Sequence, residues 1–296
     1  MATALVALLL LPALAISLAV TVPFTGTLVR FRANYTPKSR IALDEENATP
    51  TGFFSYTYLG MARRVYRIEG WKGFFKGYAT LFFSFLCICV GVALLTSYQP
   101  FVWRGVPRIP PLGIVGAAVT ILLSIILGVP YRVLVHRSMI TPYELSILHP
   151  IQSWNALLVP TLFPSGLLSV TAFITVASAV VFGLIRNLLL TWANQLVYPI
   201  SNLPLALYYI LAIVFTIMIT PLDMIATRLA VQGSSAIGEN EESSLVGETV
   251  VKLRDEQVEV PYTGVVDCAT RIWDEEGWPV LYRGWWFTLL GVAYFF

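Results

Sequence analysis

Long apolar stretches separated by polar connectors dominate the sequence. About 20 consecutive apolar residues are enough for an α-helix to cross the hydrocarbon core of a bilayer. The pattern therefore predicts an all-α membrane protein with six transmembrane helices. The apolar stretches are residues 2–29, 77–98, 111–131, 156–185, 203–222 and 284–296.

The distribution of charge supports six crossings. If every stretch spans the membrane, connectors 30–76, 132–155 and 223–283 lie on one side. All 17 acidic residues and all but three of the 19 Lys and Arg residues fall in these connectors. The exceptions are Arg104, Arg108 and Arg186. Because basic residues stay on the side from which insertion proceeds, this side is expected to face that compartment.

The ends of the chain fit this pattern less simply. Residues 1–20 are apolar and end in small residues, as secretory signals do, but they lack a basic start and continue into Pro23. We therefore expect a mature span. The 13 residues of the last stretch would form a helix of only about 20 Å, shorter than the core of about 30 Å. Either this helix begins inside the membrane or the sixth crossing is incomplete.

An internal repeat organises the chain. Residues 69–77 align without a gap with residues 276–284, in the pattern E-G-W-x-x-[FL]-[FY]-[KR]-G. Upstream, three prolines each precede a basic residue at a similar offset. These pairs are Pro23 and Arg30, Pro130 and Arg137, and Pro221 and Arg228. Self-similarity at a fixed period indicates repeated structural units. One domain, 1–296, is therefore predicted to contain repeats 1–105, 106–200 and 201–296.

Each repeated element has a physical interpretation. A proline kinks a helix by removing a backbone hydrogen bond. Connector segments 57–69 and 262–275 carry apolar residues at helical intervals, which predicts amphipathic helices on the surface. Glycine in the left-handed conformation would end them, and a basic residue followed by glycine would start the next span beside a lipid phosphate. Ordinary turn or interface residues explain any single position equally well. The helix-ending pairs are Glu69-Gly70 and Glu276-Gly277, and the candidate lipid-binding pairs are Lys76-Gly77 and Arg283-Gly284.

These motifs resemble the signature of the mitochondrial carrier family, whose members carry Px[DE]xx[KR]x[KR] followed by [DE]Gxxxx[FYW][KR]G three times. The third repeat matches from Pro221 to Gly284, the first matches in its second half, and the second keeps its proline and basic end. The resemblance implies a pseudosymmetric six-helix barrel, multi-pass in a mitochondrial membrane, with both termini away from the charged connectors. It also implies cardiolipin at the two lipid-binding pairs.

Departures from the family pattern concern the closures of the barrel. The family closes its matrix end with salt bridges between the acid of one proline motif and the base of the next. Here the acid positions hold Thr25, Arg132 and Asp223, and the base positions hold Leu28, Val135 and Ala226. Arg132 and Asp223 have opposite charges, so we expect them to pair. A partly wet pair contributes only about 1 kcal/mol, which is too little by itself to hold a gate shut. The other end has no [FY][DE]xx[KR] closure near 98–104 or 182–190.

The apolar stretches restrict the solute. By the resemblance, substrate contacts fall on Ser84 and Gly291, and the second repeat gives no reliable equivalent. No charged residue or histidine lies in 77–103, 150–185 or 284–296. An unpaired anion loses several kcal/mol of solvation in such surroundings. Nucleotides, phosphate and carboxylates are therefore poor candidates.

Two functions remain open. The first is transport of a small uncharged or weakly polar solute, favoured by the third repeat and the chain length. The second is a carrier-derived scaffold, insertase or membrane-dynamics factor of the mitochondrial outer membrane, favoured by the lost closures and the short last stretch. The sequence does not choose between the inner and the outer membrane. The partners expected are membrane lipids together with a solute or a protein.

Other chemistry finds little support in the composition. Of the residues, 57% are hydrophobic and 12% are charged, against about 25% charged in soluble domains. The net charge of +2 gives no reason to expect nucleic acid. Two histidines and three cysteines lack ligand or catalytic spacing, so we expect no enzyme, metal or cofactor. Segment 233–260 is acidic and poor in aromatics, which predicts a flexible loop. The acceptor patterns at Asn34 and Asn47 are expected to carry no glycan.

Overall fold

The computed structural model describes the chain over most of its predicted helices. The described residues are 2–38, 57–84, 86, 113–141, 166–178, 180, 203–232, 250–254 and 261–294. The regular structure within them is helical. Its long helices are α1 (Ala2–Ala33), α6 (Gly113–Ile140) and α9 (Leu203–Val231). The shorter elements are α4 (Tyr58–Phe74), α10 (Val265–Arg271), the π-helix η2 (Ile272–Glu276), the 3-10 helix η3 (Trp278–Tyr282) and α11 (Trp285–Tyr294).

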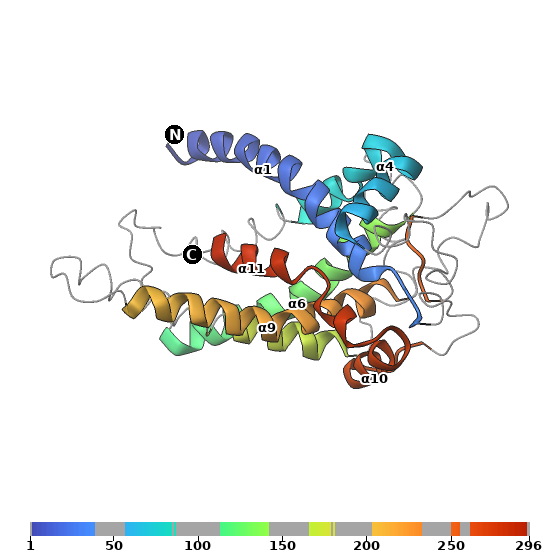
Figure 1. Cartoon of the computed structure of the whole chain (residues 1–296). Helices are drawn as coiled ribbons and strands as arrows, with labels where there is room; N and C mark the ends of the chain where they lie inside the picture. The colour runs from blue at the N-terminus through green and yellow to red at the C-terminus, as the bar shows by residue number, and fades with distance from the viewer. Residues whose placement is uncertain are drawn as a thin grey trace.

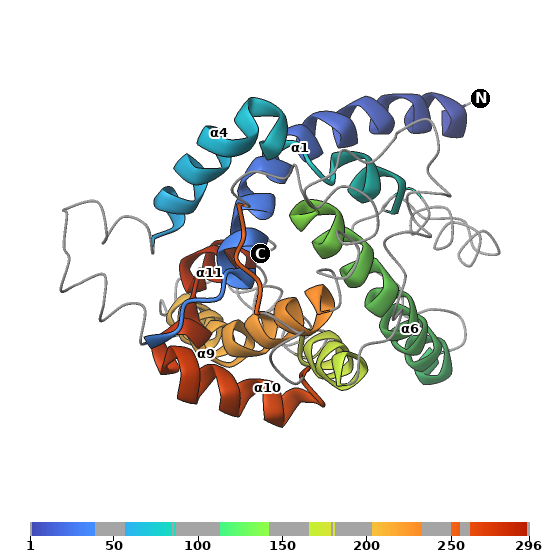
Figure 2. The same ribbon diagram turned by 90° about the vertical axis from the view of Figure 1, so that its right-hand side faces the viewer.

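The chain ends and the connector helices lie at opposite ends of the structure (Figure 1). The start of α1 and the end of α11 lie at one end, whereas α4 and α10 lie at the other. Figure 2 shows this second end, with α4 beside α1 and α10 beside α9. The described parts of the first and last charged connectors thus lie opposite the described chain ends, as the resemblance implies.

Two described helices are long and apolar enough to cross a membrane. They are Pro12–Ala33, with 22 residues and a mean hydropathy of 1.7, and Tyr209–Val231, with 23 residues and a mean hydropathy of 2.1. Residues Ile210, Ile213 and Ile217 of α9 are each at least half exposed. Exposed apolar stripes of this kind are suited to lipid. The helical class is confirmed for the described residues, but two such helices do not establish a six-helix, three-repeat bundle.

The three long helices extend beyond the apolar stretches that predict them. They run to Ala33, Ile140 and Val231, so each includes its proline and its basic end within one continuous helix. The basic side chains Arg30, Arg137 and Arg228 are buried there. Other parts of the chain provide hydrogen-bond partners for these three cations. The helices can therefore continue past the point where the hydropathy falls.

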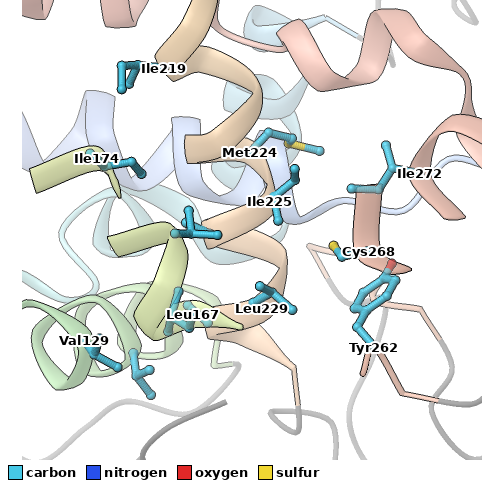
Figure 3. Close-up of a cluster of buried hydrophobic side chains, with 14 of the residues drawn as sticks. Val129, Leu167, Ile174, Ile219, Met224, Ile225, Leu229, Tyr262, Cys268 and Ile272 are labelled. Atoms are coloured by element: carbon cyan, nitrogen blue, oxygen red, sulfur yellow. The ribbon is translucent and has the colours of Figure 1, made fainter. Parts of the chain in front are cut away.

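A buried apolar cluster joins α6, residues 167–177, α9 and α10. Met224, Ile225 and Leu229 of α9 lie between Leu167 on one side and the α10 region on the other (Figure 3). A second cluster packs the end of α1 against α4 and residues 250–251. Residues 250–254, predicted as part of a flexible loop, are therefore packed against the protein, because two of their valines leave water. The remainder of that loop lies outside the described residues.

The glycines of the two Glu-Gly pairs adopt the predicted conformation: Gly70 interrupts α4, and Gly277 follows the end of η2. Gly70 has a φ of 66° and Gly277 a φ of 99°, both in the left-handed region. The glycine seven positions further on allows a close approach of two helices. A Cβ on Gly77 would lie 2.8 Å from Met139 of α6, and a Cβ on Gly284 would clash with Leu28 of α1. These contacts place the start of each following helix against a neighbouring long helix.

Candidate functional site at the charged end of the helix bundle

Asp223 lies at the centre of a charged cluster that joins three long helices. Arg132 of α6 donates from Nη1 to Asp223 Oδ1 at 2.9 Å, and Arg32 of α1 donates from Nη1 to Oδ2 at 3.1 Å. The expected contact between Arg132 and Asp223 is therefore present. The side chains of Asp223 and Arg132 are 25% and 22% exposed, whereas Arg32 is 5% exposed. We call these three residues the Asp223 cluster.

Arg32 extends the Asp223 cluster to α11. Its Nε donates to the carbonyl of Arg283 at 3.1 Å, and its Nη2 donates to Thr288 Oγ1 at 3.0 Å. One guanidinium therefore binds a carboxylate, a carbonyl and a hydroxyl on separate segments, which suits its fixed fork of donors. Arg32 was not predicted as a site residue because the family motif ends at Arg30. The second base of the Arg30-Phe31-Arg32 sequence was the available signal.

Glu69 forms a second ion-pair cluster within the first repeat. Arg30 Nη2 donates to Glu69 Oε2 at 2.9 Å, and Lys76 Nζ donates to Oε1 at 2.7 Å. Arg30 Nη1 also donates to the carbonyl of Gly73 at 2.9 Å. Because Arg30 is 1% exposed, these partners replace the water that its charge has lost. The base of the proline motif thus binds the acid of the Glu-Gly motif, a pairing that the sequence analysis did not predict.

Glu276 forms the corresponding cluster in the third repeat and is more deeply buried. Arg228 Nη2 donates to both of its carboxylate oxygens, at 2.7 and 2.9 Å. The backbone N–H and the Oγ1 of Thr36 donate to Oε2 at 2.9 and 3.1 Å. The side chains of Glu276 and Arg228 are 1% and 3% exposed. Arg283 Nη1 lies 3.8 Å from Oε2, so three donor groups and a second cation surround one carboxylate.

The two cations predicted to bind lipid face inward. Lys76 binds Glu69 and lies 3.4 Å from the carbonyl of Thr141. Arg283 donates to the carbonyl of Asn34 at 2.8 Å and to the Thr36 hydroxyl. Burial and the neighbouring Arg228 lower the pKa of Arg283 to about 10, although Glu276 opposes this shift. Both basic side chains therefore serve internal contacts in this structure, and their role toward lipid remains a prediction.

Arg137 shows how the second repeat differs. It is fully buried, and it donates from Nε to the carbonyl of Ala230 at 3.0 Å and from Nη2 to that of Gln232 at 2.7 Å. These carbonyls lie at the end of α9, where helical carbonyls lack partners and favour a cation. Without an acid at the Glu-Gly position, this base therefore caps a neighbouring helix.

Residues 34–38 follow α1 and bind the third repeat. The N–H of Tyr35 donates to the carbonyl of Lys252 at 2.8 Å, and the N–H of Lys252 donates to Asn34 Oδ1 at 3.0 Å. Lys38 Nζ donates to the carbonyl of Asp274 at 2.9 Å. Asn34 is 8% exposed, and its amide oxygen is engaged, so this acceptor pattern is unsuited to a glycan in the folded chain. Asn47 lies outside the described residues.

The predicted solute contact lies apart from the ion pairs. Ser84 is 7% exposed and Thr80 is 5% exposed, and both lie in the helical segment 78–84. No charged side chain lies in this segment. Gly291 lies in α11. Among the residues that the structure describes, no group of three or more His, Cys, Asp or Glu side chains is placed to hold a metal.

The described residues form a helical protein in which two helices are long and apolar enough to cross a membrane, and its long helices are joined at one charged end. Residues 209–296 match the family model described as mitochondrial carrier protein. This match covers less than half of the chain and shows that these residues are similar to a mitochondrial carrier protein. The matched residues contain Asp223, Arg228 and the Glu276 cluster. No curated protein matches the chain.

Proposed function

We propose that this protein transports a small uncharged or weakly polar solute across a mitochondrial membrane. The observation that supports this proposal is where the charged side chains lie along the described helices. Their charged side chains gather at the connector end, and the apolar parts of the same helices offer hydroxyl groups such as Thr80 and Ser84. A pathway of this kind stabilises a neutral solute better than an anion, because an anion there would lack a cation. We propose no enzymatic role.

The proposal includes six transmembrane helices in three repeats. Three glycines with positive φ support it, because each directly precedes a helical segment. They are Gly77, Gly166 and Gly284, with φ values of 84°, 82° and 72°. A Cβ on Gly166 would lie 2.9 Å from the N–H nitrogen of Val265. Each helix that follows one of these glycines thus begins against a residue of another predicted repeat. Gly77 of the first repeat lies against the second, Gly166 of the second lies against the third, and Gly284 of the third lies against the first.

The Asp223 cluster is proposed as the closure at the charged end. It joins α1, α6 and α9 through one carboxylate, so opening this end requires that Asp223 release at least one arginine. Alternating access by rocking of repeats needs such a breakable contact. The basic residues come from the first and second repeats, and the acid comes from the third.

Reconstitution tests transport directly. Purified full-length protein in liposomes is expected to take up at least one member of a neutral-solute panel, with uptake slowed at least severalfold in Ser84→Ala. Asp223→Asn is expected to change the rate by weakening the closure, whereas Asp274→Asn, an exposed acid outside the cluster, serves as the control. Absence of uptake and of counter-exchange for every solute would refute the proposal.

A non-transporting scaffold, insertase or membrane-dynamics factor is the second candidate. The observation that favours it is the number of contacts fixing the charged end: Arg32 alone binds α9 and α11, and Glu276 binds the segment after α1. A protein that never opens this end can retain all of them. Protease protection in mitochondria distinguishes the candidates, because outer-membrane residence favours the scaffold and inner-membrane residence favours transport.

A further inference from the structure

Residues 250–254 of the last connector cross the charged end of the protein. Figure 2 shows them running from the side of α4 to the side of α9. Val250 and Val251 are 6% and 7% exposed, because they pack in the apolar cluster formed by the end of α1 and by α4. The segment is therefore packed onto the helices although it belongs to none of them.

Two parts of this segment bind different parts of the chain. The backbone of Lys252 pairs with the residues after α1: its carbonyl accepts from the N–H of Tyr35 at 2.8 Å, and its N–H donates to Asn34 Oδ1 at 3.0 Å. Arg254 instead binds the region of η2, since its Nη2 donates to Glu275 Oε1 at 3.0 Å. The segment thus joins the end of α1 to the last part of the chain.

The same segment covers a small cavity beside a buried ion pair. The cavity has a volume of about 20 Å³, and its wall includes Leu253 and Arg254 on one side and Arg228 and Tyr262 on the other. A volume of this size holds about one water molecule. Arg228 Nε is buried and has no hydrogen-bond partner among the described residues, whereas Nη2 of the same side chain binds Glu276. The cavity therefore lies between the segment and the cation of this ion pair.

We propose that residues 250–254 form a strap that closes the charged end and releases from it before the helices separate. The strap is held by two valines, by the two hydrogen bonds of the Lys252 backbone and by an ion pair whose carboxylate is 28% exposed. The helices α9 and α10, by contrast, share one large buried apolar cluster. Segments with few buried apolar contacts open locally at a lower free energy than the core.

Release of the strap changes the surroundings of the buried ion pair. With the strap in place, the side chains of Arg228 and Glu276 are 3% and 1% exposed, so each charge depends on the other for its stabilisation. When Leu253 and Arg254 leave, the cavity opens to solvent, and an ion pair in contact with water contributes much less. The strap thus controls how firmly Glu276 holds the segment after α1. This inference applies to a transporter and to a scaffold alike, so a failed transport assay does not decide it.

Cysteine accessibility tests the release. The full-length chain carries Cys87→Ala, Cys89→Ala and Val251→Cys, and it retains Cys268 as an internal reference because Cys268 is fully buried in the cluster shared by α9 and α10. The purified protein in detergent reacts with a water-soluble maleimide, and mass spectrometry gives the rate at each position relative to the denatured chain. Position 251 is expected to be protected against the denatured chain, yet to react faster than Cys268 by a factor on the order of ten or more.

Substitutions within the strap assign the release to its ion pair. Arg254→Gln is expected to raise the rate at position 251 about threefold and to leave that of Cys268 unchanged. Lys252→Gln is the matched control, since it removes an exposed cation from the same strap and keeps the backbone hydrogen bonds. A second reporter, Ala33→Cys in place of Val251→Cys, lies in the wall of the cavity. It is expected to respond to Arg254→Gln in the same way.

Each alternative result would overturn a defined part of the proposal. Equal protection of position 251 and Cys268 would show that the segment opens only when the whole protein unfolds, and no protection at position 251 would show that the strap is not closed. Equal effects of Arg254→Gln and Lys252→Gln would exclude the ion pair as the contact that holds the strap. A response at position 251 without one at position 33 would contradict its role as a cover for the cavity.

Discussion

Glu276 provides the sharpest test of the charged end, because a single atom replacement disturbs most of its contacts. Glu276→Gln keeps the size of the side chain and exchanges one carboxylate oxygen for an NH₂ group. Both oxygens accept from Arg228, and Oε2 also accepts from the N–H and the hydroxyl of Thr36. Whichever oxygen is replaced, the new amide donor faces another donor. Arg228, 3% exposed, also loses the carboxylate that balances its charge.

The expected loss of stability follows from the burial of the ion pair between Arg228 and Glu276. Removing one partner of a buried ion pair costs about 3–5 kcal/mol, because the other charge is left without compensation. In a domain of this size, 1 kcal/mol corresponds to about 2–4 °C in melting temperature. The expected decrease is therefore on the order of 10 °C. Glu69→Gln should cost less, since the Glu69 side chain is 13% exposed against 1% for Glu276, so water reaches this cluster more readily even though Arg30 is itself buried.

Thermal unfolding of the purified chain in one detergent measures how strongly each substitution destabilises the protein. Asp274→Asn is the matched control, because it removes an acidic charge two residues away from an exposed position. The expected ranking of destabilisation is Glu276→Gln, then Glu69→Gln, then Asp274→Asn. The reasoning would be refuted if Glu276→Gln melted within about 2 °C of the control, which corresponds to less than about 1 kcal/mol. Glu276 would then not be the residue that holds Thr36 to the last part of the chain.

The remaining predictions concern single contacts. In double-mutant cycles monitored by unfolding, Asp223 should couple more strongly to Arg32 than to Arg132, by about 1 kcal/mol, because Arg32 is less exposed; equal coupling would contradict this. Cys268 should resist maleimide at neutral pH until the chain unfolds, because burial raises the pKa of its thiol to about 12 and only the thiolate reacts; site-resolved mass spectrometry detects modification. Gly284→Ala should lower the melting temperature by several degrees, since its φ of 72° and its approach to α1 both exclude a Cβ.

Local patterns allowed much of the fold to be predicted. Hydropathy predicted helices where the structure has α1, α6, α9 and α11, and the spacing of apolar residues predicted surface helices over the residues of α4 and α10. The positive φ of Gly70 and Gly277 follows equally from a local rule, because a helix that ends in Glu-Gly needs a residue that adopts the left-handed conformation.

The partners of the basic residues could not be predicted in this way. Arg30 and Glu69 are separated by 39 positions, and Arg32 and Asp223 by 191 positions. No periodicity connects residues so far apart, and the family pattern directed attention to positions 25, 28 and 135 instead. Gly166 escaped notice for a different reason: the residues before it are Pro164 and Ser165, which do not fit the aromatic and basic pattern that marks Gly77 and Gly284.

The basic ends of the three long helices also explain how the predicted second repeat, whose motif is degenerate, is held to the rest of the described chain. Arg30 binds Glu69 and Arg228 binds the buried Glu276, whereas Arg137 binds carbonyls at the end of α9. Carbonyl partners come from the backbone, so they persist when the acidic side chain of a motif is lost. The same repeat supplies Arg132 to Asp223. Arg132 and Arg137 thus bind Asp223 and two carbonyls at the end of α9, which makes α9 the helix whose displacement would disturb all three long helices together.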